Sequence, residues 1–106
     1  MKLALLNTSI ITTPGNYDLK QISISHAREL VKGHILDSAI GHQSTADIMT
    51  TLLGVYIPVN RQQFCHEVGQ QALVFKLNGR PEEGKILSVE DIESIGYSFM
   101  LLTRNN

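Results

Sequence analysis

The chain has 106 residues and a formal net charge of −1. That length suits one domain, which can bury about two-thirds of its unfolded surface without crosslinks. Hydrophobic residues make up 42% of the chain, a share that argues against disorder. The near-zero net charge argues against coating of long DNA or RNA, and no apolar run approaches the roughly 18 residues of a membrane span.

The amino terminus and the cysteine content predict a cytoplasmic protein. The apolar start, Met1 to Leu6, turns polar too soon for a signal peptide. The single cysteine, Cys65, cannot form an internal disulfide, which suits the reducing cytosol. A small, highly charged ligand stays compatible with this composition, because a few well-placed Arg and Lys side chains bind phosphates whatever the net charge.

The first predicted strand covers residues 3–6 and is followed by the polar stretch Asn7-Thr8-Ser9. Polar groups directly beyond a buried strand are where open α/β sheets bind ligands, although a simple bend explains these residues equally well. Residues 20–24 predict a short alternating strand. Ser25 then predicts the N-cap of a helix that ends at Gly33.

The stretch Ser38-Ala39-Ile40-Gly41-His42-Gln43-Ser44-Thr45 is the centre of the chain. Ser44 as N-cap and Asp47 at N3 predict a helix that ends at Gly54. Its first amides, from Thr45 on, would point back at Gly41 and His42 with a partial positive charge behind them, which makes an anion site.

Two residues before this helix suit phosphate chemistry. Gly41 allows close approach of a phosphate, and the imidazole of His42 can donate a proton near neutral pH. The alternative is that this is an ordinary helix start with a surface histidine. His26, His34 and His42 recur every eight residues, but glycines interrupt any shared helix and no carboxylate accompanies them, so no metal site is predicted.

The second half of the chain predicts further strands and a short helix. Residues 55–59 contain Pro58 and predict a loop or edge strand, and residues 62–68 a possible strand. The strongest strand is Gln71 to Leu77, apolar on both faces as in a central strand, with Lys76 as its polar exception.

The carboxyl-terminal part completes the predicted architecture. Ser88 and Asp91 predict a capped short helix that ends at Gly96, and residues 97–103 a final strand before a fraying tail. The elements together predict an α/β fold, a single-domain mixed sheet of about five strands flanked by two or three helices.

Three blocks carry a resemblance to a known family. They are Leu5-Leu6-Asn7-Thr8-Ser9, Ala39-Ile40-Gly41-His42-Gln43-Ser44-Thr45, and Asn60-Arg61 followed by Arg80-Pro81-Glu82-Glu83-Gly84-Lys85. In this order and spacing the chain resembles the viral anti-CRISPR ring nucleases, small proteins of archaeal viruses, phages and bacterial mobile elements. The resemblance implies a homodimer that binds cyclic tetra-adenylate across its interface and cleaves it without a metal or other cofactor, which switches off type III CRISPR signalling.

The resemblance also implies site residues. His42 takes the place of the catalytic histidine, Arg80 and Glu83 those of the catalytic arginine and glutamate, and Arg61 that of a second phosphate-contacting arginine. Asn7 and Ser9 match the amino-terminal contacts, with Thr8 as the alternative to Ser9. Further phosphate contacts would come from one group of residues: Gly41, Gln43, Ser44, Thr45, Lys76 and Lys85.

Two other functions stay open from the sequence. A cyclic-nucleotide sponge or sensor would bind the ring through the same arginines, with His42 only donating a hydrogen bond. A host-protein interaction module would use the exposed edge of the sheet and need no phosphate site. Cleavage of the labelled ring in EDTA separates the first of these alternatives from an enzyme.

Overall fold

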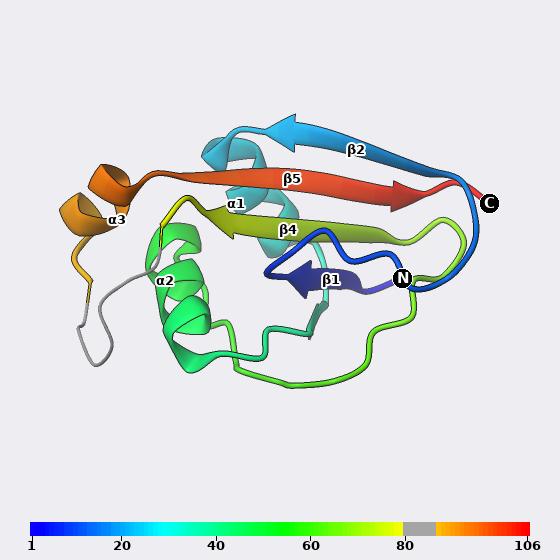
Figure 1. Cartoon of the computed structure of the whole chain (residues 1–106), viewed down its shortest axis with the longest axis horizontal. Helices are drawn as coiled ribbons and strands as arrows, with labels where there is room; N and C mark the ends of the chain where they lie inside the picture. The colour runs from blue at the N-terminus through cyan, green and yellow to red at the C-terminus, as the bar shows by residue number, and fades with distance from the viewer. Residues whose placement is uncertain (80–86) are drawn as a thin grey trace.

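The computed structural model describes residues 1–79 and 87–106, which form a five-stranded mixed sheet with three helices (Figure 1). This confirms the predicted fold class. In chain order the elements are β1 (Leu3–Leu6), β2 (Tyr17–Ile22), α1 (Ile24–Gly33), β3 (Leu36–Ser38), α2 (Gln43–Leu53), β4 (Gln71–Leu77), α3 (Val89–Ile95) and β5 (Tyr97–Arg104).

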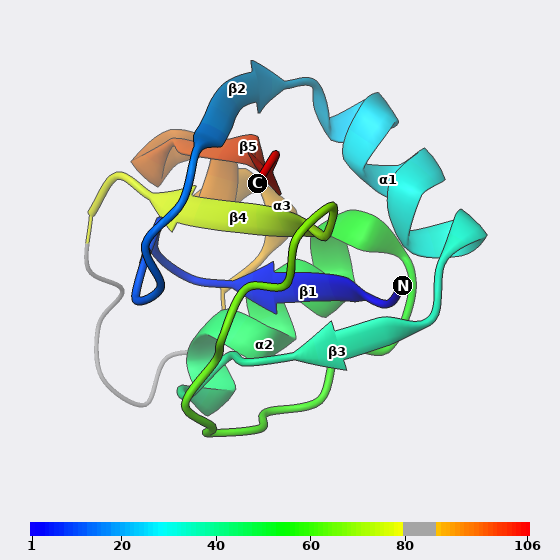
Figure 2. The same cartoon turned by 90° about the vertical axis from the view of Figure 1, so that its right-hand side faces the viewer.

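The strand order in the sheet is β2-β5-β4-β1-β3. β1 runs parallel to β3 and β4, whereas β5 runs antiparallel to β4 and β2. β4 lies in the middle with Ala72 to Phe75 buried, as its two-sided apolar sequence predicted. Because β1, β3 and β4 are parallel, their carboxyl ends meet at one edge of the sheet (Figures 1 and 2).

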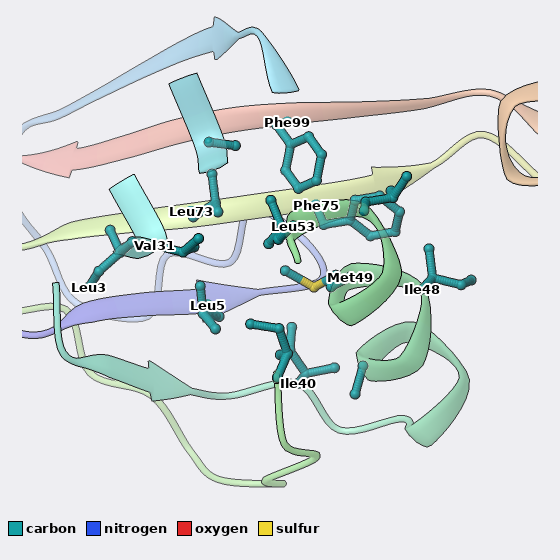
Figure 3. Packing of buried hydrophobic residues seen from close by; sticks show 14 of the residues in the cluster. Leu3, Leu5, Val31, Ile40, Ile48, Met49, Leu53, Leu73, Phe75 and Phe99 are labelled. Carbon is teal, nitrogen blue, oxygen red and sulfur yellow. The ribbon is translucent and has the colours of Figure 1, made fainter. Parts of the chain in front are cut away.

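The helices pack against one face of the sheet. Met49 and Leu53 of α2 lie beside Leu5 of β1 and Phe75 of β4 in a single apolar cluster (Figure 3). The same cluster includes Ala27 and Val31 of α1 and Ile92 of α3. On the opposite face a smaller cluster is completed by side chains outside the helices: Tyr17, Ala39 and Phe64. No described helix has the length and apolar character needed to cross a membrane.

The N-caps of both long helices lie two residues before the predicted ones. Ser23, not Ser25, caps α1, because its hydroxyl accepts a hydrogen bond from the His26 amide while Ile24 packs against the core. α2 begins at Gln43 with His42 as its N-cap, so the predicted N-cap Ser44 lies inside the first turn. Asp47 bonds the amide side chain of Gln43 rather than a backbone amide.

Other local predictions had mixed outcomes. The stops at Gly54 and Gly96 are confirmed, each with a positive φ, as is the capping box between Ser88 and Asp91. Residues 62–68 are not a strand: the Gln62 side chain donates to the Ser38 carbonyl and the Arg104 side chain donates to the His66 carbonyl, so hydrogen bonds that involve a side chain join this segment to the sheet.

The carboxyl-terminal tail does not fray as predicted. β5 extends to Arg104, and the amide of Asn105 donates to the Asn16 carbonyl over 2.7 Å. The amide of Asn16 in turn donates to the carbonyl of Asn106 over 2.9 Å. The predicted strand at 20–24 begins earlier, at Tyr17, and ends at Ile22, because its pairing with β5 continues to Arg104.

Candidate active site

The ends of β1 and β3 bring two of the predicted site segments to the same edge of the sheet. Leu5 pairs with Ser38, and the Ala39 amide donates to the Leu5 carbonyl over 2.9 Å. Asn7 follows β1 directly and is half-buried, whereas Thr8 and Ser9 are exposed. The polar stretch after β1 therefore lies beside the carboxyl end of β3, from which the chain continues into Gly41 and His42.

The start of α2 is exposed at this edge. His42 has an extended backbone with φ −126° and ψ 130°, and the Ala46 amide donates to its carbonyl over 3.1 Å. No side chain of the described residues caps the helix, and the His42 side chain is exposed. The backbone amides of the first turn, which includes Gln43, Ser44 and Thr45, therefore face this edge with the positive end of the helix dipole.

Arg61 comes to the same place from a distant part of the sequence. Its Nε atom lies 3.5 Å, and its Cγ atom 3.8 Å, from the position that a β-carbon on Gly41 would occupy. Gly41 is not among the glycines with a positive φ, so its backbone does not require glycine. The missing side chain leaves space beside the arginine, at the amino end of α2.

Ser38 connects the segment around Arg61 with the segment that leads from β3 to His42. It is 5% exposed, and its hydroxyl donates to the Pro58 carbonyl over 2.7 Å while accepting from the Ile40 amide over 3.3 Å. The Asn60 amide donates to the Ile40 carbonyl over 2.8 Å. Neither Ser38 nor Asn60 is among the site residues predicted from the sequence; a polar residue at the end of a buried strand is the signal that could have indicated Ser38.

The other predicted site residues are Lys76, Arg80, Glu83 and Lys85. Lys76 is exposed and lies two positions beyond Val74, which pairs with Leu6, so it is near the carboxyl edge of the sheet. Successive residues of a strand alternate between faces, and Phe75 points into the helix-covered core, so Lys76 points to the other face. Arg80, Glu83 and Lys85 lie outside the described residues.

The arrangement combines three chemical capacities within a few residues. The start of α2 and the guanidinium of Arg61 can bind an anion, Gly41 leaves room for it, and His42 can exchange a proton with it. Among the residues that the structure describes, no group of three or more His, Cys, Asp or Glu side chains is placed to hold a metal ion.

Comparison with known proteins gives consistent matches over nearly the whole chain. The profile of the family described as STIV B116-like matches residues 3–99. The uncharacterised protein YddF of Bacillus subtilis (strain 168) is 38% identical over 106 residues, 98% of each chain. The uncharacterised protein ORF117 of Acidianus two-tailed virus is 32% identical over 108 residues, covering 96% of this chain and 92% of that protein.

A solved structure has the same fold. B116 of Sulfolobus turreted icosahedral virus superposes with a TM-score of 0.83 at 26% identity, and the alignment covers 98% of this chain and 100% of that chain. The five-stranded sheet with its helices on one face is therefore an architecture that this chain shares with a viral protein.

Proposed function

We propose that this chain, which belongs to the STIV B116-like family, is a metal-independent ring nuclease that cleaves cyclic tetra-adenylate to linear di-adenylates. In a cell with type III CRISPR defence, this reaction would remove the second messenger and switch off the signal. The gene could then serve as a viral anti-CRISPR or as a cellular off-switch.

One observation carries the proposal. His42 lies at the uncapped start of α2. Gly41 precedes it in the chain, and the Arg61 side chain lies against Gly41. Groups that can bind an anion and a group that can donate a proton therefore lie within the same few residues. This combination suits a phosphodiester whose charge must be neutralised and whose leaving oxygen must be protonated.

The proposed reaction uses a nucleophile that RNA carries itself. The 2′-oxygen forms a bond to the neighbouring phosphorus, the bond from phosphorus to the 5′-oxygen breaks, and the imidazolium of His42 gives its proton to that 5′-oxygen. The proton of the 2′-hydroxyl is lost to solvent. The protein need only hold the 2′-oxygen in line and supply the acid, so no metal-bound nucleophile is required.

Two-fold symmetry extends this site to a ring of four phosphates. One chain contributes one start of α2 and one Arg61, and a homodimer doubles both. Lys76 and the residues carried by resemblance, Arg80 and Lys85, would add positive charge. Glu83 would orient Arg80 or a ribose hydroxyl.

The test is cleavage of labelled cyclic tetra-adenylate in EDTA. The expected products are linear di-adenylates whose 3′ ends carry a 2′,3′-cyclic phosphate or its hydrolysis product. Tight binding without any product would instead identify a sponge or sensor. Neither binding nor cleavage would exclude both and leave a protein interaction module.

A further inference from the structure

Two amide side chains on either side of Arg61 bind one carbonyl group. The Asn60 side chain donates to the Ser38 carbonyl over 2.8 Å, and the Gln62 side chain donates to the same oxygen over 2.7 Å. The Gln62 amide also donates to the Asp37 carboxylate over 2.9 Å. Because a carbonyl oxygen has two lone pairs, the side-chain amides of Asn60 and Gln62 occupy both acceptor positions of the Ser38 carbonyl.

The backbone beside these amides is attached at further points. The Ile57 amide donates to the Thr50 hydroxyl of α2 over 2.9 Å, the Pro58 carbonyl accepts from the Ser38 hydroxyl, and the Asn60 amide donates to the Ile40 carbonyl. The chain from residue 57 to residue 62 is thus bound both to α2 and to the segment that leads from β3 into His42.

The attachment accounts for the approach of Arg61 to Gly41. Arg61 is exposed and forms no hydrogen bond or ion pair with another described residue, so no described partner holds the guanidinium in place. Its side chain nevertheless lies against Gly41, with the stem atom Cγ 3.8 Å and Nε 3.5 Å from the added β-carbon position. Among the described residues, the side chains of its two neighbours hold the backbone at the point where this stem begins.

We infer that Asn60 and Gln62 are positioning residues that, through the Ser38 carbonyl, hold Arg61 beside Gly41 before any ligand arrives. We name this set, Asn60, Gln62 and the Ser38 carbonyl, the amide clamp. The inference rests on the proposed function for its ligand, a cyclic oligonucleotide phosphate. An arginine with many rotamers loses less freedom on binding when its stem is already held, so the amide clamp raises affinity without touching the phosphate.

The first arm of the test uses the free protein. The side-chain Nε–H of Arg61 is followed by ¹⁵N NMR, with the signal assigned from its loss in Arg61→Lys. Its heteronuclear NOE is expected to be positive in the wild type and to fall in Asn60→Ala and Gln62→Ala. Gln63→Ala is the matched control, since Gln63 is an exposed neighbouring glutamine. An unchanged NOE in both amide variants would overturn the inference.

The second arm is a double-mutant cycle with cyclic tetra-adenylate. We expect Gln62→Ala to weaken binding roughly 3- to 10-fold, as for loss of one or two hydrogen bonds, and to raise KM more than it lowers kcat. In an Arg61→Ala background the same change should alter affinity less than about two-fold. Equal losses in both backgrounds would show that Gln62 does not act through Arg61.

The two arms separate this inference from the proposed function. If the wild-type protein neither binds nor cleaves cyclic tetra-adenylate, the proposed function fails, and the NMR arm still decides whether the amide clamp orders Arg61. If the ring is bound and cleaved but the cycle shows no coupling, the proposed function stands and the amide clamp does not.

Discussion

Arg61 lies against Gly41, with its Nε atom 3.5 Å from the position of an added β-carbon, although 19 residues of sequence separate the two. This contact brings a guanidinium to the uncapped start of α2, beside His42. The proposed site is therefore assembled by the packing of the segment after α2 against the end of β3.

Gly41→Ala should leave the fold intact and impair function. The added methyl group would meet Arg61 only at ordinary van der Waals distances of 3.5 and 3.8 Å, and no positive φ is disturbed. It would, however, occupy the space proposed for a phosphate. We expect a melting temperature within a few degrees of wild type and a clear loss of affinity for cyclic tetra-adenylate.

The control for this variant is Gly33→Ala. Gly33 ends α1, has no atom within 4 Å of an added β-carbon and no positive φ. Alanine there should be neutral or slightly stabilising, because it is a better helix former than glycine. If the two variants bind the ring equally well, the space beside Gly41 has no role in binding.

His42→Ala should keep binding and lose cleavage. Loss of one general acid typically costs roughly 10²- to 10⁴-fold in rate, whereas the proposed anion contacts are those of Arg61 and the start of α2. Single-turnover cleavage and equilibrium binding measure the two effects separately. His26→Ala is the matched control, since His26 is also exposed but lies on α1.

Single-turnover cleavage by His42→Ala at the wild-type rate would assign the acid to another residue.

Arg61→Ala should weaken binding roughly 10- to 100-fold, as for loss of a charge-assisted contact to phosphate. The affinity of the wild type should also fall more steeply with salt than that of the variant. Lys32→Ala removes an exposed cation from the last turn of α1 and serves as the control. Identical affinity and salt dependence in both variants would remove Arg61 from the site.

The protein should be a dimer when it binds the ring. A ring with four phosphates would remain largely exposed on one small subunit, whereas two symmetric copies can enclose it. Light scattering at micromolar protein, with and without cyclic tetra-adenylate, measures the mass. A monomer in the presence of bound ligand would count strongly against a site shared by two chains.

Much of the fold could be predicted from short stretches of the sequence. β4 is apolar on both faces and lies at the centre of the sheet; the capping box of Ser88 and Asp91 begins α3; Gly54 ends α2. These signals work because each depends on neighbouring residues, either through a local hydrogen bond or through the period of the strand. The position of Gly41 and His42 before α2 could be predicted from the sequence for the same reason.

The tertiary structure decided what local signals leave open. Ser44 and Ser25 offered caps as good as those used, but Ile24 and the buried Ile40 set where the chain enters each helix. Residues 62–68 are a possible strand from the sequence, yet Gln62 bonds β3 through its side chain. The sequence alone predicted the three helices and the strands β1, β2, β4 and β5, though not β3, and it predicted an anion site at the start of α2. Only long-range packing decided that Arg61 meets Gly41, because that contact depends on hydrogen bonds to Ser38 between segments more than 20 residues apart.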